Sequence, residues 1–408
     1  MPKWTNKGHE FDELGNYFKE NKNILILGYD DNKNNEIKKK LDFLADKVKI
    51  TSKKVDTILY YLIKHFGTAF LPKNTIFVVE QDSHKILRRL LSYKSVQQNK
   101  NVFMQNDFFE KYLSIFAVYV ADITYSESQC NILTTLCTLN CKHCLNFNPY
   151  LKDASHNDFE IIKRNIDIYF KAFDYCGLFH LSGGEPFMHP KCSNIIRYIH
   201  DNYKDKIQEL GVSSNLVVNL SDELCQALHD CNVILFVDDY TDQIDEKKIR
   251  LFKQSMEKLK KYNVNYVINK GSELRWFGVF PPVADYTKLT ENDLACRYDK
   301  CGYRNSEIRN GFINNCNYSG FAQRAGIVEQ DYSEWYDLNT YTRDKKIELI
   351  EYRLGYSEKG YPEFCKYCNG YTNINPNNFV PVGEQVKGTL SWNRENPLEI
   401  IYDKETVE

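Results

Sequence analysis

The chain has 408 residues, of which 42% are hydrophobic, so it can bury at least one large core and form two or three structural units. Its formal net charge is -2, with basic residues dispersed among acidic ones, and we therefore expect neither a nucleic-acid partner nor an anionic membrane partner. The N-terminus lacks the apolar core of a signal peptide, and the apolar run at 112–121 is too short to span a bilayer. These features predict a cytoplasmic protein.

Cysteine is frequent in this sequence, which contains 13 of them. Disulfides are disfavoured in the reducing cytosol, so the cysteines indicate metal binding or redox chemistry instead. Their spacing is therefore the main evidence for function.

The first segment, residues 1–122, has the pattern of a small α/β unit. Three short apolar runs alternate with three helical patterns, at 23–28, 75–80 and 101–105 for the strands and at 37–44, 55–65 and 86–91 for the helices. This alternation predicts a parallel, Rossmann-like domain. Only Gly28 follows the first strand, so the three-glycine turn of a dinucleotide site is absent, and we expect a recognition or docking role.

A second alternation of strands and helices occupies residues 123–285. The expected strands lie at 131–136, 178–182, 210–214, 233–237, 264–268 and 275–280. Six strands with helices between them predict a partial (β/α)6 barrel. Barrels of this kind place their chemistry at the carboxyl ends of the strands, and the motifs described next follow strands.

The run CTLNCKHC places Cys137, Cys141 and Cys144 directly after the first barrel strand. One loop of this kind can wrap three thiolates around a [4Fe-4S] cubane and leave the fourth iron without a protein ligand. An open coordination position is what a catalytic metal needs, and here it could bind the amino and carboxylate groups of S-adenosylmethionine (SAM). The alternative is a zinc knuckle, but no fourth Cys or His lies at ordinary zinc spacing.

This C-x3-C-x2-C loop resembles the defining signature of the radical SAM superfamily. The sequence Gly183-Gly184-Glu185-Pro186 after the second strand resembles the second mark of that superfamily. The resemblance implies that His143 packs near adenine, that the glycines allow close backbone approach, and that Glu185 accepts a hydrogen bond from the methionine ammonium. No catalytic side chain follows from these motifs.

Two weaker motifs follow the third and fourth barrel strands. Their similarity to the superfamily implies further SAM contacts, which would come from Ser213, Ser214, Asn215, Asp238 and Asp239. Both motifs depart from the usual pattern, because Leu216 stands where glycine is common and Asp238 where serine is common. Plain loop capping is the alternative role for these polar residues.

A second cysteine group lies in residues 286–385, followed by a tail at 386–408. Cys301 and Cys316 flank Gly311 in a C-x9-G-x4-C pattern, and a C-x2-C pair follows at Cys365 and Cys368. The pattern resembles the twitch domain, a short relative of the SPASM domain, and implies an auxiliary [4Fe-4S] cluster. Cys296 competes as a ligand, and a zinc ribbon made by the same thiolates is the alternative.

Five cysteines fit no ligand spacing, and we interpret them as packing residues: Cys130, Cys176, Cys192, Cys225 and Cys231. Any of them could in principle give a hydrogen atom to a substrate radical. The sequence does not identify which one.

From about residue 125 to 385 the chain resembles radical SAM proteins of the SPASM/twitch type that are often associated with capsule and exopolysaccharide loci. The resemblance rests on the two cysteine groups, on LSGGEPFMHP, and on the PVGEQ run at 381–385. It implies an oxidoreductase or isomerase that acts on a small sugar-like or nucleotide-sugar substrate, with a flavodoxin- or ferredoxin-type reductant. The alternatives are a maturase of ribosomal peptides and a non-catalytic iron-sulfur electron-transfer protein.

Overall fold

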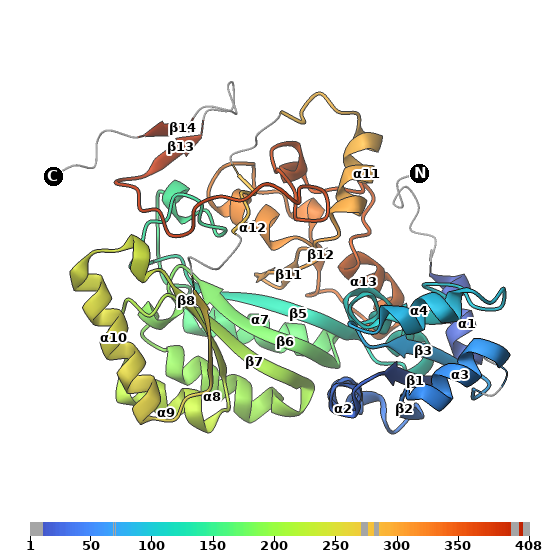
Figure 1. Cartoon of the computed structure of the whole chain (residues 1–408). Coiled ribbons are helices and arrows are strands. Elements are labelled where there is room, and N and C mark those ends of the chain that lie inside the picture. Colours follow the sequence, from blue (N-terminus) through green and yellow to red (C-terminus); the bar gives the residue numbers. More distant parts are fainter. Residues whose placement is uncertain are drawn as a thin grey trace.

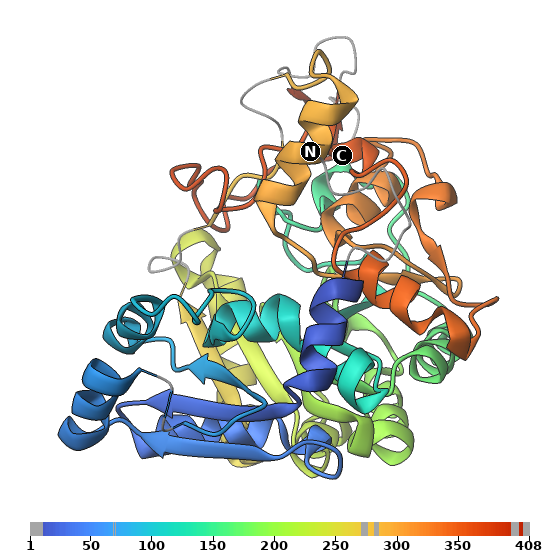
Figure 2. The same cartoon turned by 90° about the vertical axis from the view of Figure 1, so that its right-hand side faces the viewer.

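The computed structural model describes residues 11–67, 69, 71–270, 276–280, 285–392 and 400–402. These residues form an N-terminal α/β unit, a larger α/β unit beside it, and a C-terminal segment that lies above both (Figure 1 and Figure 2). The mixed α/β class with parallel sheets agrees with the expectation from the sequence.

The N-terminal unit is a four-stranded parallel sheet in the order β2-β1-β3-β4. Its elements are α1 (Asp12–Glu20), β1 (Asn23–Gly28), α2 (Asp31–Lys40), β2 (Ile50–Lys54), α3 (Thr57–Phe66), β3 (Thr75–Val79), α4 (His84–Leu91) and β4 (Val102–Met104). The sequence predicted three of these strands and missed β2. Strand β2 lies at the sheet edge with a polar, partly exposed sequence, so it lacks the apolar run by which the others are recognised.

A helical connection joins the two α/β units. It contains α5 (Gln105–Asp107), α6 (Leu113–Phe116) and two wider π-helical turns at Phe108–Tyr112 and Ala117–Ala121, and it ends where Asp122 takes a left-handed φ of 58°. Its aromatic side chains pack with those of α1 and β4 in one buried cluster, with the rings of Phe18 and Phe116 5.3 Å apart. This connection completes the N-terminal core.

The larger unit is a parallel sheet whose strands follow one another in sequence order. Its elements are β5 (Tyr125–Thr134), α7 (Phe159–Ala172), β6 (Tyr175–Gly183), α8 (Cys192–Tyr203), β7 (Ile207–Ser214), α9 (Asp222–Asp230), β8 (Ile234–Asp239), α10 (Glu246–Lys261) and β9 (Tyr266–Lys270). The sequence predicted a sixth strand at 275–280, but residues 276–280 do not join this sheet. Phe277 instead forms an antiparallel bridge with Phe379. Arg275, at the start of that expected strand, lies outside the described residues.

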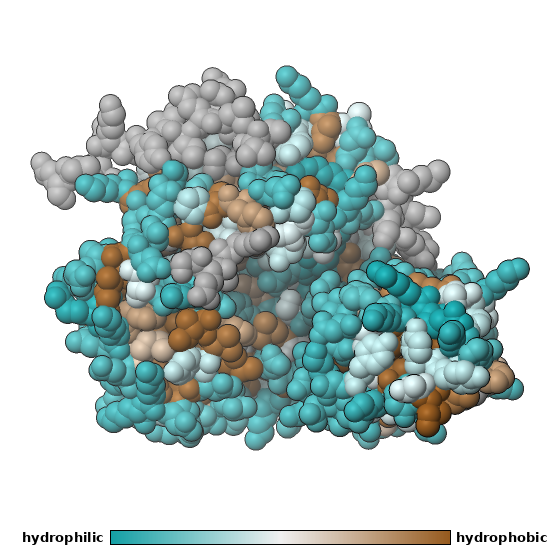
Figure 3. Space-filling view, viewed as in Figure 1, coloured by the Kyte–Doolittle hydropathy of each residue, from teal (hydrophilic) through white to brown (hydrophobic). Residues whose placement is uncertain are grey.

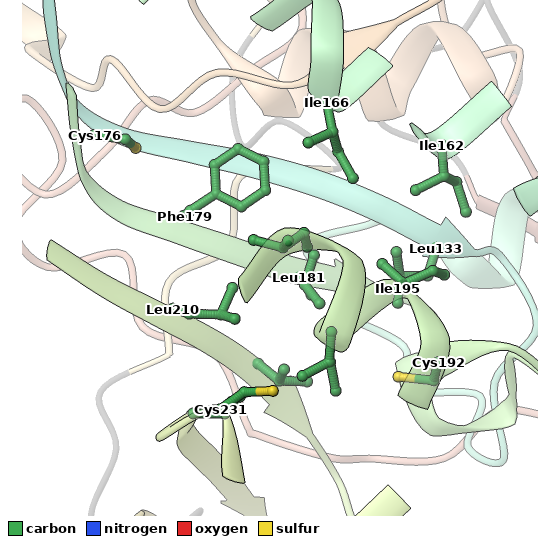
Figure 4. Close-up of a cluster of buried hydrophobic side chains, with 14 of the residues drawn as sticks. Leu133, Ile162, Ile166, Cys176, Phe179, Leu181, Cys192, Ile195, Leu210 and Cys231 are labelled. Atoms are coloured by element: carbon green, nitrogen blue, oxygen red, sulfur yellow. The ribbon is translucent and has the colours of Figure 1, made fainter. Parts of the chain in front are cut away.

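The main core lies between this sheet and the helices that cover one of its faces. Figure 4 shows Ile162 and Ile166 of α7 directed toward Phe179 and Leu181 of β6. Four of the five cysteines that match no ligand spacing are buried in the same core: Cys176, Cys192, Cys225 and Cys231. This burial agrees with the packing role predicted for those four.

The face of the molecule seen in Figure 3 is mostly hydrophilic, with an apolar area over the last strands of the larger sheet. Val267 and Ile268 of β9, the edge strand, are 50% and 46% exposed. Within the described part of the chain, no helix combines the length and the apolar character needed to cross a membrane.

The C-terminal segment contains short elements arranged around a small antiparallel sheet. They are α11 (Glu291–Cys301), β10 (Ile308–Arg309), β11 (Phe312–Ile313), α12 (Asn317–Arg324), β12 (Tyr336–Asp337), α13 (Lys346–Arg353), β13 (Leu390–Trp392) and β14 (Ile400–Tyr402). The turn between β10 and β11 consists of Asn310 and Gly311, with φ of 53° and 78°. Two consecutive left-handed residues make a tight hairpin turn at Gly311.

A backbone contact attaches the C-terminal segment to the first barrel strand, next to a buried ion-pair group. The backbone N–H of Cys130 on β5 donates to the carbonyl of Ser306 at 2.8 Å. The next residue, Glu307, has a fully buried side chain and pairs with Arg309, at 3.1 Å, and with Arg324. The ion pairs join Arg309 of β10 to Arg324 of α12 through Glu307, because a buried carboxylate is costly without such partners.

Glu307→Gln should destabilise the protein strongly, because it leaves two partly buried guanidinium groups without their carboxylate. The expected loss in the free energy of unfolding is about 3 kcal/mol or more, measured by urea unfolding of the full chain. As a matched control, Glu160→Gln breaks the pair with Lys163 on the surface, where Glu160 is 72% exposed. That change should cost no more than about 0.5 kcal/mol, and equal losses for both variants would contradict the structural role of Glu307.

Candidate active site at the carboxyl ends of the barrel strands

A cavity of about 220 Å³ lies at the carboxyl ends of β5 to β8. Its lining comes from the cysteine loop, from the ends of these strands, and from the C-terminal segment around α12. This is the end of a parallel barrel at which side chains from successive strands converge. The sequence motifs singled out above follow the same strand ends.

Two glycines hold the cysteine loop against the end of β6. The N–H of Gly184 donates to Thr134 O and the N–H of Glu185 to Leu136 O, both at 2.8 Å. A Cβ on Gly184 would lie 2.2 Å from Leu136 O, and Gly183 has a φ of 151°. No side chain fits there, so the glycines let the chain pass close enough to fix where the loop starts.

Cys137, Cys141 and Cys144 all line the cavity. Burial raises the pKa of each thiol, to about 12 for Cys141, so these groups become thiolates when a metal replaces the proton. Two amides donate to the sulfurs: Asn215 Nδ2 lies 3.6 Å from Cys137 Sγ, and Gln385 Nε2 lies 3.2 Å from Cys141 Sγ. Amide donors of this kind suit negatively charged sulfur ligands.

The spacing of the thiols bears on the kind of metal centre. In the described part of the chain, no group of three or more His, Cys, Asp or Glu side chains is placed to hold a single metal ion. Ligands of one zinc ion converge on a single point at about 2.3 Å per sulfur, whereas each thiolate of a cubane binds a different iron and stands further from the others. The three cysteines line one cavity, as ligands of a shared cluster must.

The structure brings most of the predicted SAM-binding residues to the cavity. Those in its lining are His143, Gly183, Gly184, Ser213, Ser214, Asn215 and Asp238. The remaining three, Glu185, Pro186 and Asp239, lie outside the lining. Asp239 instead accepts from the N–H of Thr241 at 2.9 Å, which is the loop-capping role considered as an alternative. SAM contact by the lining residues remains a prediction.

Glu185 has partners inside the protein. Its carboxylate is fully buried and accepts from Ser214 Oγ at 2.8 Å and from the N–H groups of Asn215 and Phe187 at 2.9 and 3.1 Å. Burial raises its pKa to about 7, and these hydrogen bonds oppose the rise. The carboxylate therefore joins the end of β6 to the end of β7. Its predicted contact with a methionine ammonium remains a prediction, because its hydrogen-bond partners belong to the protein and it does not line the cavity.

His143 provides a test of whether the cavity fits an adenine-bearing cofactor. Its ring lines the cavity, and its Nδ1 is buried without a hydrogen-bond partner among the described residues. The indole of Trp276 donates to its backbone carbonyl at 3.0 Å and so holds the residue in place. A buried ring nitrogen without a partner costs free energy, so a bound ligand would satisfy it. The residues present fit SAM beside a three-cysteine cluster.

Several cavity residues were missed by the sequence analysis. His180 lies on β6, and the C-terminal segment adds Tyr303, Asn305, Asn317, Tyr318 and Phe321. Cys130 on β5, which the sequence indicated as a packing residue, lies in a buried cluster and also lines the cavity. Burial raises the pKa of Cys130 to about 12, so its thiol keeps its proton. Alternation along β6 could have indicated His180, but no sequence signal brings residues 303–321 to this site.

The second cysteine group lines a separate cavity of about 20 Å³. Cys301, Cys316, Cys365 and Cys368 all contribute to it, whereas the competing Cys296 does not. Backbone N–H groups donate to two of the sulfurs: that of Gly370 to Cys368 at 3.3 Å and that of Tyr371 to Cys301 at 3.4 Å. Burial, then the neighbouring thiols, raise the pKa of Cys365. Four of the five candidate cysteines thus share one cavity, and their role as cluster ligands remains a prediction.

Comparison with known proteins gives one match to a family model. Residues 131–269 match the model of the Radical SAM superfamily. No curated protein matches the sequence.

Several solved structures are similar to parts of this chain. They include native anSMEcpe with bound AdoMet and a Kp18Cys peptide (12% identity, TM-score 0.38, covering 63% of this chain and 93% of that one). BtrN in complex with AdoMet and 2-DOIA is 16% identical, with a TM-score of 0.36, and covers 62% of this chain and 97% of that one. Streptococcus suis SuiB bound to S-adenosylmethionine is 13% identical, with a TM-score of 0.32, and covers 77% and 87%. These TM-scores are too low to support a statement about substrate.

The family match spans the strands and loops that build the cavity, and the C-x3-C-x2-C loop lies within it. The chain therefore contains a radical SAM domain. It is a radical SAM enzyme, a class whose members use a [4Fe-4S] cluster and SAM.

His180 should remain neutral throughout the physiological range. Its Nε2 pairs with Ser213 Oγ at 2.9 Å, and burial lowers its pKa to about 4 because the charged ring is disfavoured away from water. The folded state thus binds this proton less tightly than the unfolded chain. The resulting stabilisation is present above the unfolded pKa of about 6.5 and is lost as the pH falls through about 4.

NMR of ring-labelled histidine, with His180→Gln to assign the resonance, measures this directly. The His180 signal should not titrate between about pH 8 and about pH 5.5, and a midpoint near about 6.5 would show that the ring is solvated.

Proposed function

We propose that this radical SAM enzyme removes a hydrogen atom from a small sugar-like or nucleotide-sugar substrate and completes an oxidation or an epimerisation. The observation that carries the proposal is the chemistry of the cavity wall contributed by the C-terminal segment. Tyr303 and Tyr318 stack there with centroids 4.5 Å apart, and Asn305 and Asn317 add amide groups. Aromatic faces beside neutral hydrogen-bonding groups suit a sugar ring, which has apolar C–H faces and hydroxyl edges.

The charge of the cavity favours a small neutral substrate over a phosphate-bearing one. Among the described residues that line the cavity there is no Lys or Arg, and its carboxylate comes from Asp238. Burial raises the pKa of Asp238 to about 6, although Asn269 donates to it at 3.1 Å. Phosphates are usually bound by Arg, Lys or a helix N-terminus. The diphosphate of a nucleotide sugar would therefore have to lie outside this lining.

The protein's own residues would bind, orient and shield the reactants. Cys137, Cys141 and Cys144 would hold the [4Fe-4S] cluster, while Gly183 and Gly184, which line the same cavity, would border SAM. When bound, the cluster and SAM together supply a 5′-deoxyadenosyl radical, which can take a hydrogen atom from an unactivated carbon. The aromatic rings at the other wall would exclude water from the reacting carbon.

Two features bear on the outcome after hydrogen removal. The thiol of Cys130 lines the cavity and is protonated, so it could return a hydrogen atom to the opposite face of the carbon, which supports epimerisation. The sulfur radical would then need one electron, for which we propose a flavodoxin- or ferredoxin-type donor, and one proton from solvent. Loss of one proton and one electron from the substrate radical would instead give oxidation, and Cys301, Cys316, Cys365 and Cys368 would hold an auxiliary cluster able to accept that electron.

We assign the auxiliary [4Fe-4S] cluster to Cys301, Cys316, Cys365 and Cys368. The support is their joint presence around one small, largely apolar cavity, together with two backbone N–H donors to sulfur. A zinc ribbon uses the same four thiolates, and metal analysis separates the two.

Cysteine substitutions should remove one cluster at a time. After anaerobic reconstitution, Cys137→Ala/Cys141→Ala should lose the iron and sulfide of one [4Fe-4S] cluster, because two of three ligands to that cluster are gone. Cys365→Ala/Cys368→Ala should lose the other, and Cys296→Ala should lose neither. Iron and sulfide analysis with electron paramagnetic resonance (EPR) measures this. Zinc in place of iron at the second group, or loss of iron in Cys296→Ala, would overturn the assignment.

The substrate proposal is tested with deuterated candidate sugars and SAM under reducing, anaerobic conditions. Deuterium should appear in 5′-deoxyadenosine, which mass spectrometry detects. Parallel reactions in deuterated water separate the outcomes, since an epimer would carry solvent deuterium and an oxidised product would not. Label transfer only from a peptide substrate would favour the maturase alternative. A formed cluster that gives no 5′-deoxyadenosine at all would contradict enzymatic activity.

A further inference from the structure

A C-terminal strap, residues 383–388, runs along the cysteine loop. The N–H of Lys142 donates to Glu384 O at 2.8 Å, and the N–H of Val386 donates to Asn140 O at 2.9 Å. Cys141 and Gln385 form an antiparallel bridge. The strap therefore pairs, backbone to backbone, with the part of the loop that carries the second cluster cysteine, although the two lie more than half the chain apart in sequence.

Asn140 and Gly383 fix the position of the strap. The side chain of Asn140 donates to the carbonyls of Val386 and Gly388 at 3.1 and 2.8 Å. Gly383 has a φ of 74° and lies against Tyr240, so that a Cβ there would be 3.1 Å from the ring. Gly383 also lines the main cavity. The strap is thus held at both ends, beside the site and next to the loop.

The amide of Gln385 has an orientation that its neighbours determine. Its Oε1 accepts from the backbone N–H of Asn140 at 2.8 Å, and an N–H can only donate. Its Nε2 must therefore face the other way, where it donates to Gly383 O at 2.7 Å and to Cys141 Sγ at 3.2 Å. The amide donor toward the sulfur follows from the network rather than from the arbitrary choice between oxygen and nitrogen.

We propose that Gln385 is a positioning residue for the catalytic cluster, and that its N–H donation to Cys141 Sγ raises the reduction potential of that cluster. The inference rests on the cluster assigned to Cys137, Cys141 and Cys144. A donor aimed at a ligand sulfur draws charge from the thiolate and stabilises the reduced, more negative cluster. The strap also keeps the loop in the conformation that receives the cluster.

The test compares three variants of the full chain, reconstituted anaerobically. Gln385→Glu keeps an oxygen for the Asn140 N–H and removes the donor to sulfur, but it also adds a negative charge. Gln385→Leu removes both hydrogen bonds without adding charge, so the role of the hydrogen bond requires a shift in both variants. The control, Glu384→Gln, breaks a partly exposed ion pair with Lys142 on the same strap and leaves the sulfur contact in place. Such exposed pairs contribute little.

EPR-monitored redox titration measures the effect, and the catalytic cluster is the one whose signal changes when SAM is added. We expect a more negative midpoint for Gln385→Glu and Gln385→Leu and an unchanged one for Glu384→Gln. In Gln385→Leu the cluster should also bind about 10- to 100-fold more weakly, measured as iron lost to a chelator.

The possible results separate the role of Gln385 from the proposed function and from the cluster assignment. An unchanged midpoint in Gln385→Glu, with a SAM-responsive signal present, overturns the role of Gln385 and leaves the proposed function intact. Equal shifts in all three variants would assign the effect to a general disturbance of the strap, because the variants change its charge differently, and would overturn the hydrogen-bond role. A wild-type protein without any SAM-responsive signal would overturn the cluster assignment and this inference together.

Discussion

The site depends on the close backbone contact between Gly183-Gly184 and the end of β5. The register between β5 and β6 shifts between Ile132 and Thr134, so that Thr134 meets Gly183 at the last step of the sheet. Because no side chain separates the two backbones there, Gly184 and Glu185 can donate to the carbonyls of Thr134 and Leu136. The cysteine loop starts from this fixed point.

From this contact the connections extend to the rest of the cavity. Glu185 carries the constraint to β7 through Ser214 and Asn215, and the Asn215 amide reaches Cys137 Sγ. On the other side, Gln385 reaches Cys141 Sγ from the far end of the chain. Two of the three cysteine sulfurs of the loop thus receive a donor from an element outside the loop. Such outer hydrogen bonds orient ligands and tune the metal centre that they hold.

The sequence predicted the features that are local in the chain. The apolar runs marked the strands near their true positions, because buried parallel strands need continuous apolar residues. The cysteine loop and the glycine pair could be placed at strand ends for the same reason. Strand β2 was not predicted, because it is polar and lies at an edge of its sheet. The hydrogen-bond partners of Glu185 and the position of Cys296 outside the small cavity could not be foreseen, since both depend on contacts between distant segments.

Sequence patterns also could not predict that residues 303–321 line the cavity or that the strap pairs with the cysteine loop, because these contacts join distant segments. Asn305, Asn317 and Gln385 are ordinary loop residues by composition, and only tertiary packing brings them to the cavity and to the cysteine loop. Their roles make the C-terminal segment part of the site, in addition to any cluster that it holds. We infer a sugar-like substrate mainly from the side chains of this segment and less from those of the barrel.

Three cysteines, we propose, hold a cluster with one iron open toward the cavity. A crystal structure of the anaerobically reconstituted enzyme with SAM would show this arrangement directly. We expect a [4Fe-4S] cluster on Cys137, Cys141 and Cys144, with SAM on the iron that faces the cavity and its adenine beside His143. A single metal ion on these sulfurs, or a fourth ligand from the protein, would contradict it.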